Sequence, residues 1–275
     1  MVVEPRAEHR QRAYDVRCEW GEHGLELLAR DCAVVVIVDV LSFCTAVDIA
    51  VGRGARVLPQ RCADAATGKG QVAPSSAARR EAAALGALAA GPRDGTGPSL
   101  RPSSLLRLVP TTLLALPSPN GATLCSIAGL HSAVVLAGCL RNASAVAAAA
   151  RQVRCPIGLV AAGERWPDGT LRVAAEDALG VGAIATALQQ GDTAATRSEQ
   201  GHAPGTRDRP TLSPEARLVA AQFAAASRNG LLAVLCELAS GRELIADGYG
   251  DDVRLAADLD VSAAVPRLID GVLRG

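Results

Sequence analysis

The sequence predicts a three-layer α/β/α fold with a mainly parallel sheet and a helical C-terminal part. Residues 33–38 form an unbroken run of small and β-branched apolar side chains, which is typical of a parallel strand buried on both faces. Further short apolar segments alternate with helical patterns along the chain. Such alternation indicates a parallel sheet that is covered by helices on both faces.

The expected elements follow one another in regular order. Strands are expected at residues 14–20, 33–38, 55–59, 113–116, 133–137 and 157–161. Helices are expected at residues 22–30, 43–52, 75–88, 122–128, 143–153, 176–190, 214–227, 231–239 and 242–247. Residues 91–102 predict a loop from their Gly and Pro content, and residues 191–212 predict a flexible surface excursion. We interpret residues 1–275 as one domain.

Composition excludes several classes of protein. The 28 basic residues balance 28 acidic ones and aromatic residues make up 2%, so the chain lacks the basic surface and stacking side chains of a nucleic-acid binder. The charged N-terminus has no apolar core of a secretory signal, and the apolar runs are too short to cross a bilayer. We therefore expect a cytoplasmic protein without a membrane partner.

Carboxylates follow two expected strands and open one expected helix. Asp39 ends the strand at 33–38, which is where open α/β sheets bind ligands, although a strand-end or helix-capping role fits its position equally well. Glu164 follows another strand, and Glu176 with Asp177 begins the next helix. The eight cysteines and four histidines show no ligand spacing. Four converging carboxylates therefore predict Mg²⁺, with capping of the helix dipole as the alternative for Glu176 and Asp177.

The turn at residues 118–123 (SPNGAT) predicts an anion site. A Pro-Asn-Gly turn that leads into a helix presents backbone N–H groups and the positive end of the helix dipole to a phosphate. Thr123 could add a hydroxyl group. A second turn carries Asn142, a candidate helix cap, and Arg141, which is available to an anion. A purely structural turn is the alternative in both places.

Two other phosphatase signatures are absent. The haloacid-dehalogenase pattern needs a second aspartate two residues after the first, and that position is Leu41. The cysteine-phosphatase loop needs an arginine six residues after its cysteine, but Cys125 is followed there by His131. Cys44 has no histidine nearby in sequence, so we interpret it as a packed core residue.

Five segments, in this order and spacing, resemble the 2-phosphosulfolactate phosphatase family. They are VVVIVDVLSFCTAV (34–47), SPNGATL (118–124), LAGCLRNASAVA (136–147), AAGE (161–164) and AAEDALGVGAI (174–184), with weaker support from residues 248–266. The resemblance implies an Mg²⁺-dependent phosphatase with an α/β/α fold. Its substrate would be 2-phospho-3-sulfolactate, in the pathway toward coenzyme M or sulfolactate.

The resemblance also assigns roles to residues. It implies that Asp39, Glu164 and Asp177 are catalytic and that these three, with Glu176, bind the metal. The residues that it implies for substrate binding are Ser118, Asn120, Gly121, Thr123, Arg141, Asn142 and Arg165. The family pattern D-V-L-R-A-T-T departs at Ser42, where an arginine would clamp a phosphate or sulfonate. The substrate is therefore open unless Arg101, Arg141 or Arg165 takes that role.

The expected function is hydrolysis of a small anionic phosphomonoester with Mg²⁺. The sequence leaves open whether a carboxylate or water attacks the phosphorus, and whether the chain forms a homodimer. The alternative is a binder of an anionic metabolite on the same fold, without catalysis or with altered specificity, in which Ser42 marks the lost function.

Overall fold

The structure is a computed structural model that describes residues 6–62, 76–131, 133–153, 156–190 and 209–275. The expected excursion at 191–212 lies outside the described residues up to residue 208. Leu212 is buried and forms a bridge with Val16 at the first strand.

The expected strands and helices form within a few residues of their predicted bounds, except near residue 240, where the helix expected at 242–247 starts three residues earlier. The N-terminal half contains η1 (Ala7–Arg10), β1 (Val16–Trp20), α1 (Gly21–Ala29), β2 (Val34–Val38), α2 (Phe43–Gly52), β3 (Arg56–Gln60), α3 (Ser76–Ala84), β4 (Leu88–Ala89), η2 (Pro102–Leu105), β5 (Leu113–Pro117) and α4 (Gly121–Ala128). The C-terminal half contains β6 (Val134–Gly138), α5 (Ala143–Val153), β7 (Ile157–Ala161), β8 (Glu164–Arg165), β9 (Leu171–Arg172), α6 (Ala175–Gln190), α7 (Pro214–Asn229), α8 (Leu231–Glu237), α9 (Ala239–Ala246), α10 (Gly250–Ala257), β10 (Arg267–Ile269) and β11 (Val272–Arg274).

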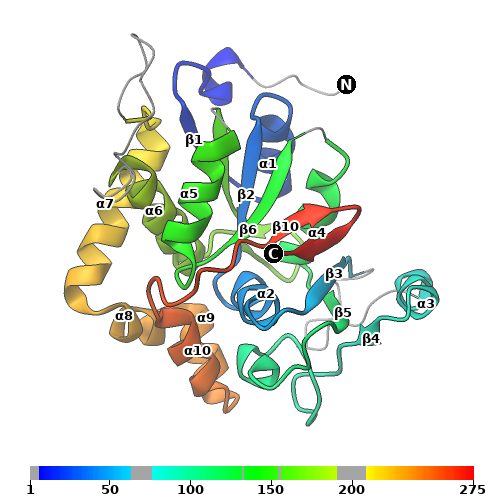
Figure 1. The fold of residues 1–275 in the computed structure, drawn as a ribbon. Helices are drawn as coiled ribbons and strands as arrows, with labels where there is room; N and C mark the ends of the chain where they lie inside the picture. The colour runs from blue at the N-terminus through cyan, green and yellow to red at the C-terminus, as the bar shows by residue number, and fades with distance from the viewer. Residues whose placement is uncertain (1–5, 63–75, 132, 154–155, 191–208) are drawn as a thin grey trace, which may run out of the picture.

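The main sheet consists of two parallel blocks joined by a C-terminal hairpin. Its strand order is β1-β7-β2-β6-β10-β11-β3-β5-β4. The strands from β1 to β6 are mutually parallel, as are β3, β5 and β4. The pairings of β6 with β10, β10 with β11 and β11 with β3 are all antiparallel. Figure 1 shows this hairpin, in red, between β6 and β3.

The hairpin corrects the expectation that the C-terminal part is purely helical. Residues 214–257 are indeed mostly helical, but β10 and β11 complete the centre of the sheet. Asp270 and Gly271 connect them with φ values of 51° and 76°. An Asp-Gly pair with two positive φ angles is the strongest short-range signal of a hairpin, and this signal in the sequence was missed.

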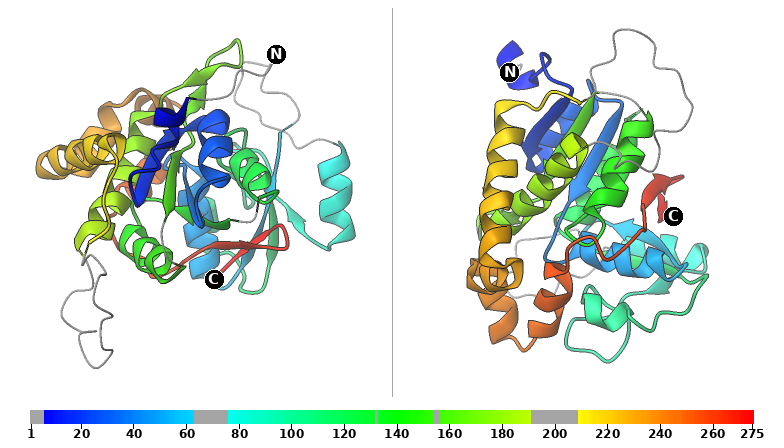
Figure 2. Two further views of the ribbon diagram at one scale, coloured as in Figure 1. Left: turned by 90° about the horizontal axis from the view of Figure 1, so that it is seen from above. Right: turned by 60° about the vertical axis from the view of Figure 1, so that its left-hand side comes forward.

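Two large apolar clusters confirm the three-layer architecture. Alternate residues of β2 point to opposite faces: Val34, Val36 and Val38 pack against α5, α6 and α7, whereas Val35 and Ile37 pack against α1, α2 and α4. Both views in Figure 2 show helices on the two sides of the sheet. Burial on both faces explains why the strand at 33–38 has no polar position.

Among the described residues, no single helix is long and apolar enough to cross a membrane. Only α7 and α8 taken together meet that criterion, and they are bent by 105° relative to one another. Their apolar side chains, including Val219, Phe223 and Leu235, belong to one of the two large clusters.

Candidate active site

Asp39 is the carboxylate on which the site is built. Its Oδ1 accepts a hydrogen bond from the backbone N–H of Phe43 at 3.1 Å, and its Oδ2 accepts one from the N–H of Gly121 at 2.9 Å. One buried carboxylate therefore caps the N-termini of both α2 and α4. A Cβ atom at Gly121 would lie 2.5 Å from the Phe43 ring and 2.7 Å from Asp39 Oδ2. The short distance between this carboxylate and α4 thus requires glycine at position 121.

The surroundings of Asp39 favour its protonated form. Burial raises the pKa of Asp39 to about 6, and the nearby charge of Glu164 also raises it. The N–H groups of Phe43 and Gly121 and the charge of Arg93 oppose this rise. A carboxyl group with a pKa near 6 can gain or lose a proton close to neutral pH, as general acid–base catalysis requires.

Asp177 joins the ends of two neighbouring strands. Its Oδ1 accepts the N–H of Val40 at 2.7 Å, just after β2, and its Oδ2 accepts the N–H of Gly163 at 2.8 Å, just after β7. Burial raises the pKa of Asp177 well above the usual value, and the charges of Asp39 and Glu176 raise it further. Asp177 therefore fixes the two loops that carry Asp39 and Glu164.

Glu164 connects this group to the turn at residues 118–123. Its Oε1 accepts hydrogen bonds from Asn120 Nδ2 at 3.1 Å and from the N–H of Arg165 at 2.9 Å. Within the turn, Ser118 Oγ accepts the N–H of Asn120 at 3.3 Å, and Thr123 Oγ1 donates to the Ser118 carbonyl at 3.3 Å. The turn thus lies beside the carboxylates as expected, but the Gly121 N–H of the expected phosphate cradle already binds Asp39.

The carboxylates fit a sparsely liganded Mg²⁺ better than a closed cage. In the part of the chain that the structure describes, no three His, Cys, Asp or Glu side chains lie close enough to hold a metal ion together. Both oxygens of Asp39 and of Asp177 accept backbone N–H groups. Mg²⁺ is usually held by one or two carboxylates with water and substrate phosphate. Asp39 and Glu164 fit that arrangement, because they are close enough for their charges to repel and a cation would relieve this repulsion.

Arg141 lies at the end of β6 and binds other parts of the protein. Its Nε donates to buried Asp48 at 2.9 Å, and its Nη1 donates to Asp258 at 3.0 Å and to the Leu255 carbonyl at 2.9 Å. The structure does not connect Arg141 with Asp39 or Glu164. These contacts give it a structural role, and substrate binding by Arg141 stays a prediction without support from them.

Asn142 and Arg165 also have partners within the protein. Asn142 is fully buried, accepts the N–H of Cys139 at 2.9 Å and donates to the Ala264 carbonyl at 3.1 Å. Arg165 forms an ion pair with Glu22 and donates to the Gly169 carbonyl at 3.1 Å. Neither side chain shows a contact with Asp39, so the structure does not add them to the group.

Cys44 is a core residue, as the sequence indicated. Its side chain is buried and its Sγ donates to the Ile37 carbonyl at 3.3 Å. Burial, together with the charge of Asp39, raises the pKa of this thiol well above its usual value. The thiolate that nucleophilic catalysis would need is therefore disfavoured.

Arg93 is a charged residue of this region that the sequence reasoning did not select. It comes from the loop between β4 and η2, and its Nη2 donates to Ser42 Oγ at 2.8 Å. Asp39 and Glu164 are both close enough to stabilise its positive charge. The sequence GPRDGTGP contains no sign of this role beyond an arginine within a Gly- and Pro-rich loop.

With this geometry in place, the chain was compared with known proteins. A model of the 2-phosphosulpholactate phosphatase family matches residues 23–271, nearly the whole chain. The chain belongs to this family. No curated protein matches it. Family membership confirms the resemblance of the five segments and identifies the chain as a phosphoric monoester hydrolase.

Proposed function

We propose that this phosphatase hydrolyses 2-phospho-3-sulfolactate to 3-sulfolactate and phosphate and that it requires Mg²⁺. The family supplies the class of reaction. The observation that carries the proposal is Asp39, a buried carboxylate shared by the N-termini of α2 and α4 and adjacent to Glu164.

The arrangement around Asp39 suits phosphoryl transfer. Hydrolysis forms a bond from water oxygen to phosphorus, breaks the ester P–O bond and leaves an alkoxide oxygen that needs a proton. Asp39, with a pKa of about 6, can hold such a proton near neutral pH. The two helix N-termini beside Asp39 favour the negative charge of a bound phosphate.

Neighbouring residues would position the metal and the catalytic groups. When bound, Mg²⁺ neutralises phosphate charge and lowers the pKa of a coordinated water. Asp39 and Glu164 would hold it, and Asn120 orients the Glu164 carboxylate through Nδ2. Asp177 keeps the β2 and β7 loops at a fixed separation through its two backbone bonds.

The test is phosphate release by the purified protein from 2-phospho-3-sulfolactate, with Mg²⁺ and after treatment with EDTA. We expect turnover with Mg²⁺ and its loss in EDTA. Equal rates in the two conditions would contradict the metal requirement. A panel of other phosphorylated hydroxy acids tests the substrate: faster hydrolysis of another member would replace it, and binding without turnover would favour the non-catalytic alternative.

A further inference from the structure

Arg93 places a buried cationic group directly beside the β2 loop. Ser42, its hydrogen-bond partner, is the residue that precedes α2 and is almost fully buried. Arg93 Nη2 lies 2.8 Å from Ser42 Oγ. Through this contact the guanidinium reaches the loop that also carries Asp39.

One nitrogen of this guanidinium is buried and unpaired. Arg93 Nη1 has no hydrogen-bond partner among the residues that the structure describes. Burying an arginine N–H group without an acceptor is unfavourable, so such a group indicates an acceptor that binds from outside the chain. The negative charges around Arg93 come from Asp252, Asp39, Tyr249 and Glu164, and none of them supplies a hydrogen bond to Nη1.

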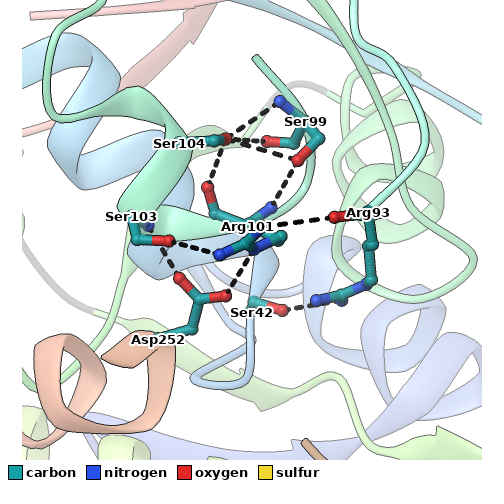
Figure 3. A network of polar contacts seen from close by, with 7 residues as sticks. All are labelled: Ser42, Arg93, Ser99, Arg101, Ser103, Ser104 and Asp252. Atoms are coloured by element: carbon teal, nitrogen blue, oxygen red, sulfur yellow. Dashed lines mark hydrogen bonds and ion pairs between the residues drawn. The ribbon is translucent and has the colours of Figure 1, made fainter. Parts of the chain in front are cut away.

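A second arginine holds the Arg93 loop in place. Arg101 donates from Nη1 to the backbone carbonyl of Arg93 at 3.4 Å and from Nε to Asp252 Oδ2 at 3.3 Å. Its guanidinium lies over the ring of Tyr249, 4.8 Å from the centroid. Asp252 is fully buried and also accepts the N–H of Ser103 at 2.8 Å. Figure 3 shows this network, with Arg93 extending from it toward Ser42.

The two arginines therefore differ in what they offer a ligand. Arg101 has protein partners for Nε, Nη1 and Nη2, whereas Arg93 has one for Nη2 and none within the described residues for Nη1. A guanidinium held in position with a free nitrogen is suited to an oxyanion, which accepts charge-assisted hydrogen bonds from it.

We propose that Arg93 binds an anionic oxygen group of the substrate beside Asp39, and that Arg101 and Asp252 are positioning residues that hold it there. The inference rests on the proposed function, since it names the substrate-binding cation of the same site. It also explains how the site keeps an arginine where Ser42 cannot provide one. The group that binds is the phosphate, the carboxylate or the sulfonate of the substrate.

The test compares Arg93→Gln and Arg93→Lys with the wild type in steady-state kinetics. We expect Arg93→Gln to lower kcat/KM at least about 30-fold through a higher KM, because it removes a charge-assisted hydrogen bond to the substrate. Arg93→Lys keeps the charge but loses the planar pair of nitrogens, so KM should rise about 10-fold. Arg53→Gln is the control, since Arg53 binds the Leu108 carbonyl instead, and it should match the wild type.

Two substrates identify the anionic group. 2-Phospho-3-sulfolactate carries a sulfonate, and 2-phospholactate lacks it. An effect of Arg93→Gln on the first substrate alone assigns Arg93 to the sulfonate, and an equal effect on both assigns it to the phosphate or carboxylate. Wild-type kinetics for Arg93→Lys with both substrates would overturn the proposal, as would those of Arg93→Gln.

Binding measurements separate this inference from the proposed function. Isothermal titration with inorganic phosphate and with 3-sulfolactate requires no turnover, so it applies even if the protein hydrolyses neither substrate. We expect the wild type to bind at least one of them and Arg93→Gln to bind it at least about 30-fold more weakly. Absence of binding by the wild type, or equal binding by the folded variants, would overturn the role of Arg93. If Arg93→Gln does not fold, Arg93→Lys supplies the comparison.

Discussion

Two strand-end turns of this protein look alike in sequence and differ in the folded chain. The turn after β2 carries Asp39, and the turn after β6 carries Arg141. Both follow buried strands and lead into helices. Asp39 is surrounded by backbone N–H groups, a second carboxylate and a guanidinium with an unpaired nitrogen. Arg141 instead binds the carboxylates of Asp48 and Asp258.

The difference shows that a polar residue at a strand end becomes a binding site only if the fold leaves binding capacity unused. Around Arg141 the charges are already matched, because Asp48 in α2 and Asp258 after α10 neutralise the guanidinium. Around Asp39 they are not, because Asp39 and Glu164 repel each other. The first arrangement stabilises the fold and the second favours a cation or a proton.

The largest expected effect is that of Asp39→Asn on turnover. The substitution keeps the shape of the side chain and removes its charge, so kcat should fall at least about 100-fold, or about 2.7 kcal/mol of barrier. The measurement is kcat at saturating substrate and Mg²⁺, with circular dichroism to confirm folding.

Asp48→Asn is the matched control from the second turn. Asp48 is also buried and burial also raises its pKa, but it faces Arg141. Its kcat should stay within about threefold of the wild type. Comparable losses in the two variants would show that burial of a carboxylate matters and its position does not.

The second prediction concerns stability against pH in the metal-free protein. The folded-state pKa of Asp39 is raised to about 6, so between about pH 4 and pH 6 the folded chain binds more protons here than the unfolded chain. The contribution of Asp39 is therefore most favourable below about pH 4 and is lost as the pH rises through 6.

Relative to Asp39→Asn, the wild type should lose roughly 2 kcal/mol of unfolding free energy between pH 4 and pH 7. The measurement is urea unfolding of both proteins in EDTA across this range. A constant difference between the two curves would mean that Asp39 ionises as readily in the folded chain as in the unfolded one.

A third prediction concerns Arg141→Gln. Removing this guanidinium leaves the buried Asp48 carboxylate without its cation, so the free energy of unfolding should fall by about 1.5 kcal/mol. KM should remain unchanged if the turn after β6 is purely structural. A rise in KM without a loss of stability would instead return Arg141 to the substrate-binding residues.

The smallest expected effect is that of Asn120→Ala. This variant removes the hydrogen bond from Nδ2 to Glu164 Oε1, which is about 1 kcal/mol or roughly a fivefold loss in kcat/KM. Ser126→Ala is the control in the same region, because Ser126 Oγ donates only to the Ala122 carbonyl within α4. Equal kinetics for both variants would mean that Glu164 does not need Asn120 to keep its orientation.

The sequence by itself determined the local elements, the reaction class and the central residue. The apolar run at 33–38 specifies a doubly buried strand because every position is apolar, and Asp39 marks its end. The five family segments lie in β2, β6 and β7, their following turns and helices, and the turn before α4. These features depend on neighbouring residues, and local patterns report them well.

Only the tertiary structure decided which charges meet. Arg93 and Ser42 are 51 residues apart, Asp39 and Gly121 are 82 apart, and Arg141 and Asp258 are 117 apart. No local pattern encodes such pairings, since they follow from the packing of whole strands and helices. The same charged side chains can therefore form an ion pair or an unfilled binding site, and the partner that the fold brings to each one makes the choice.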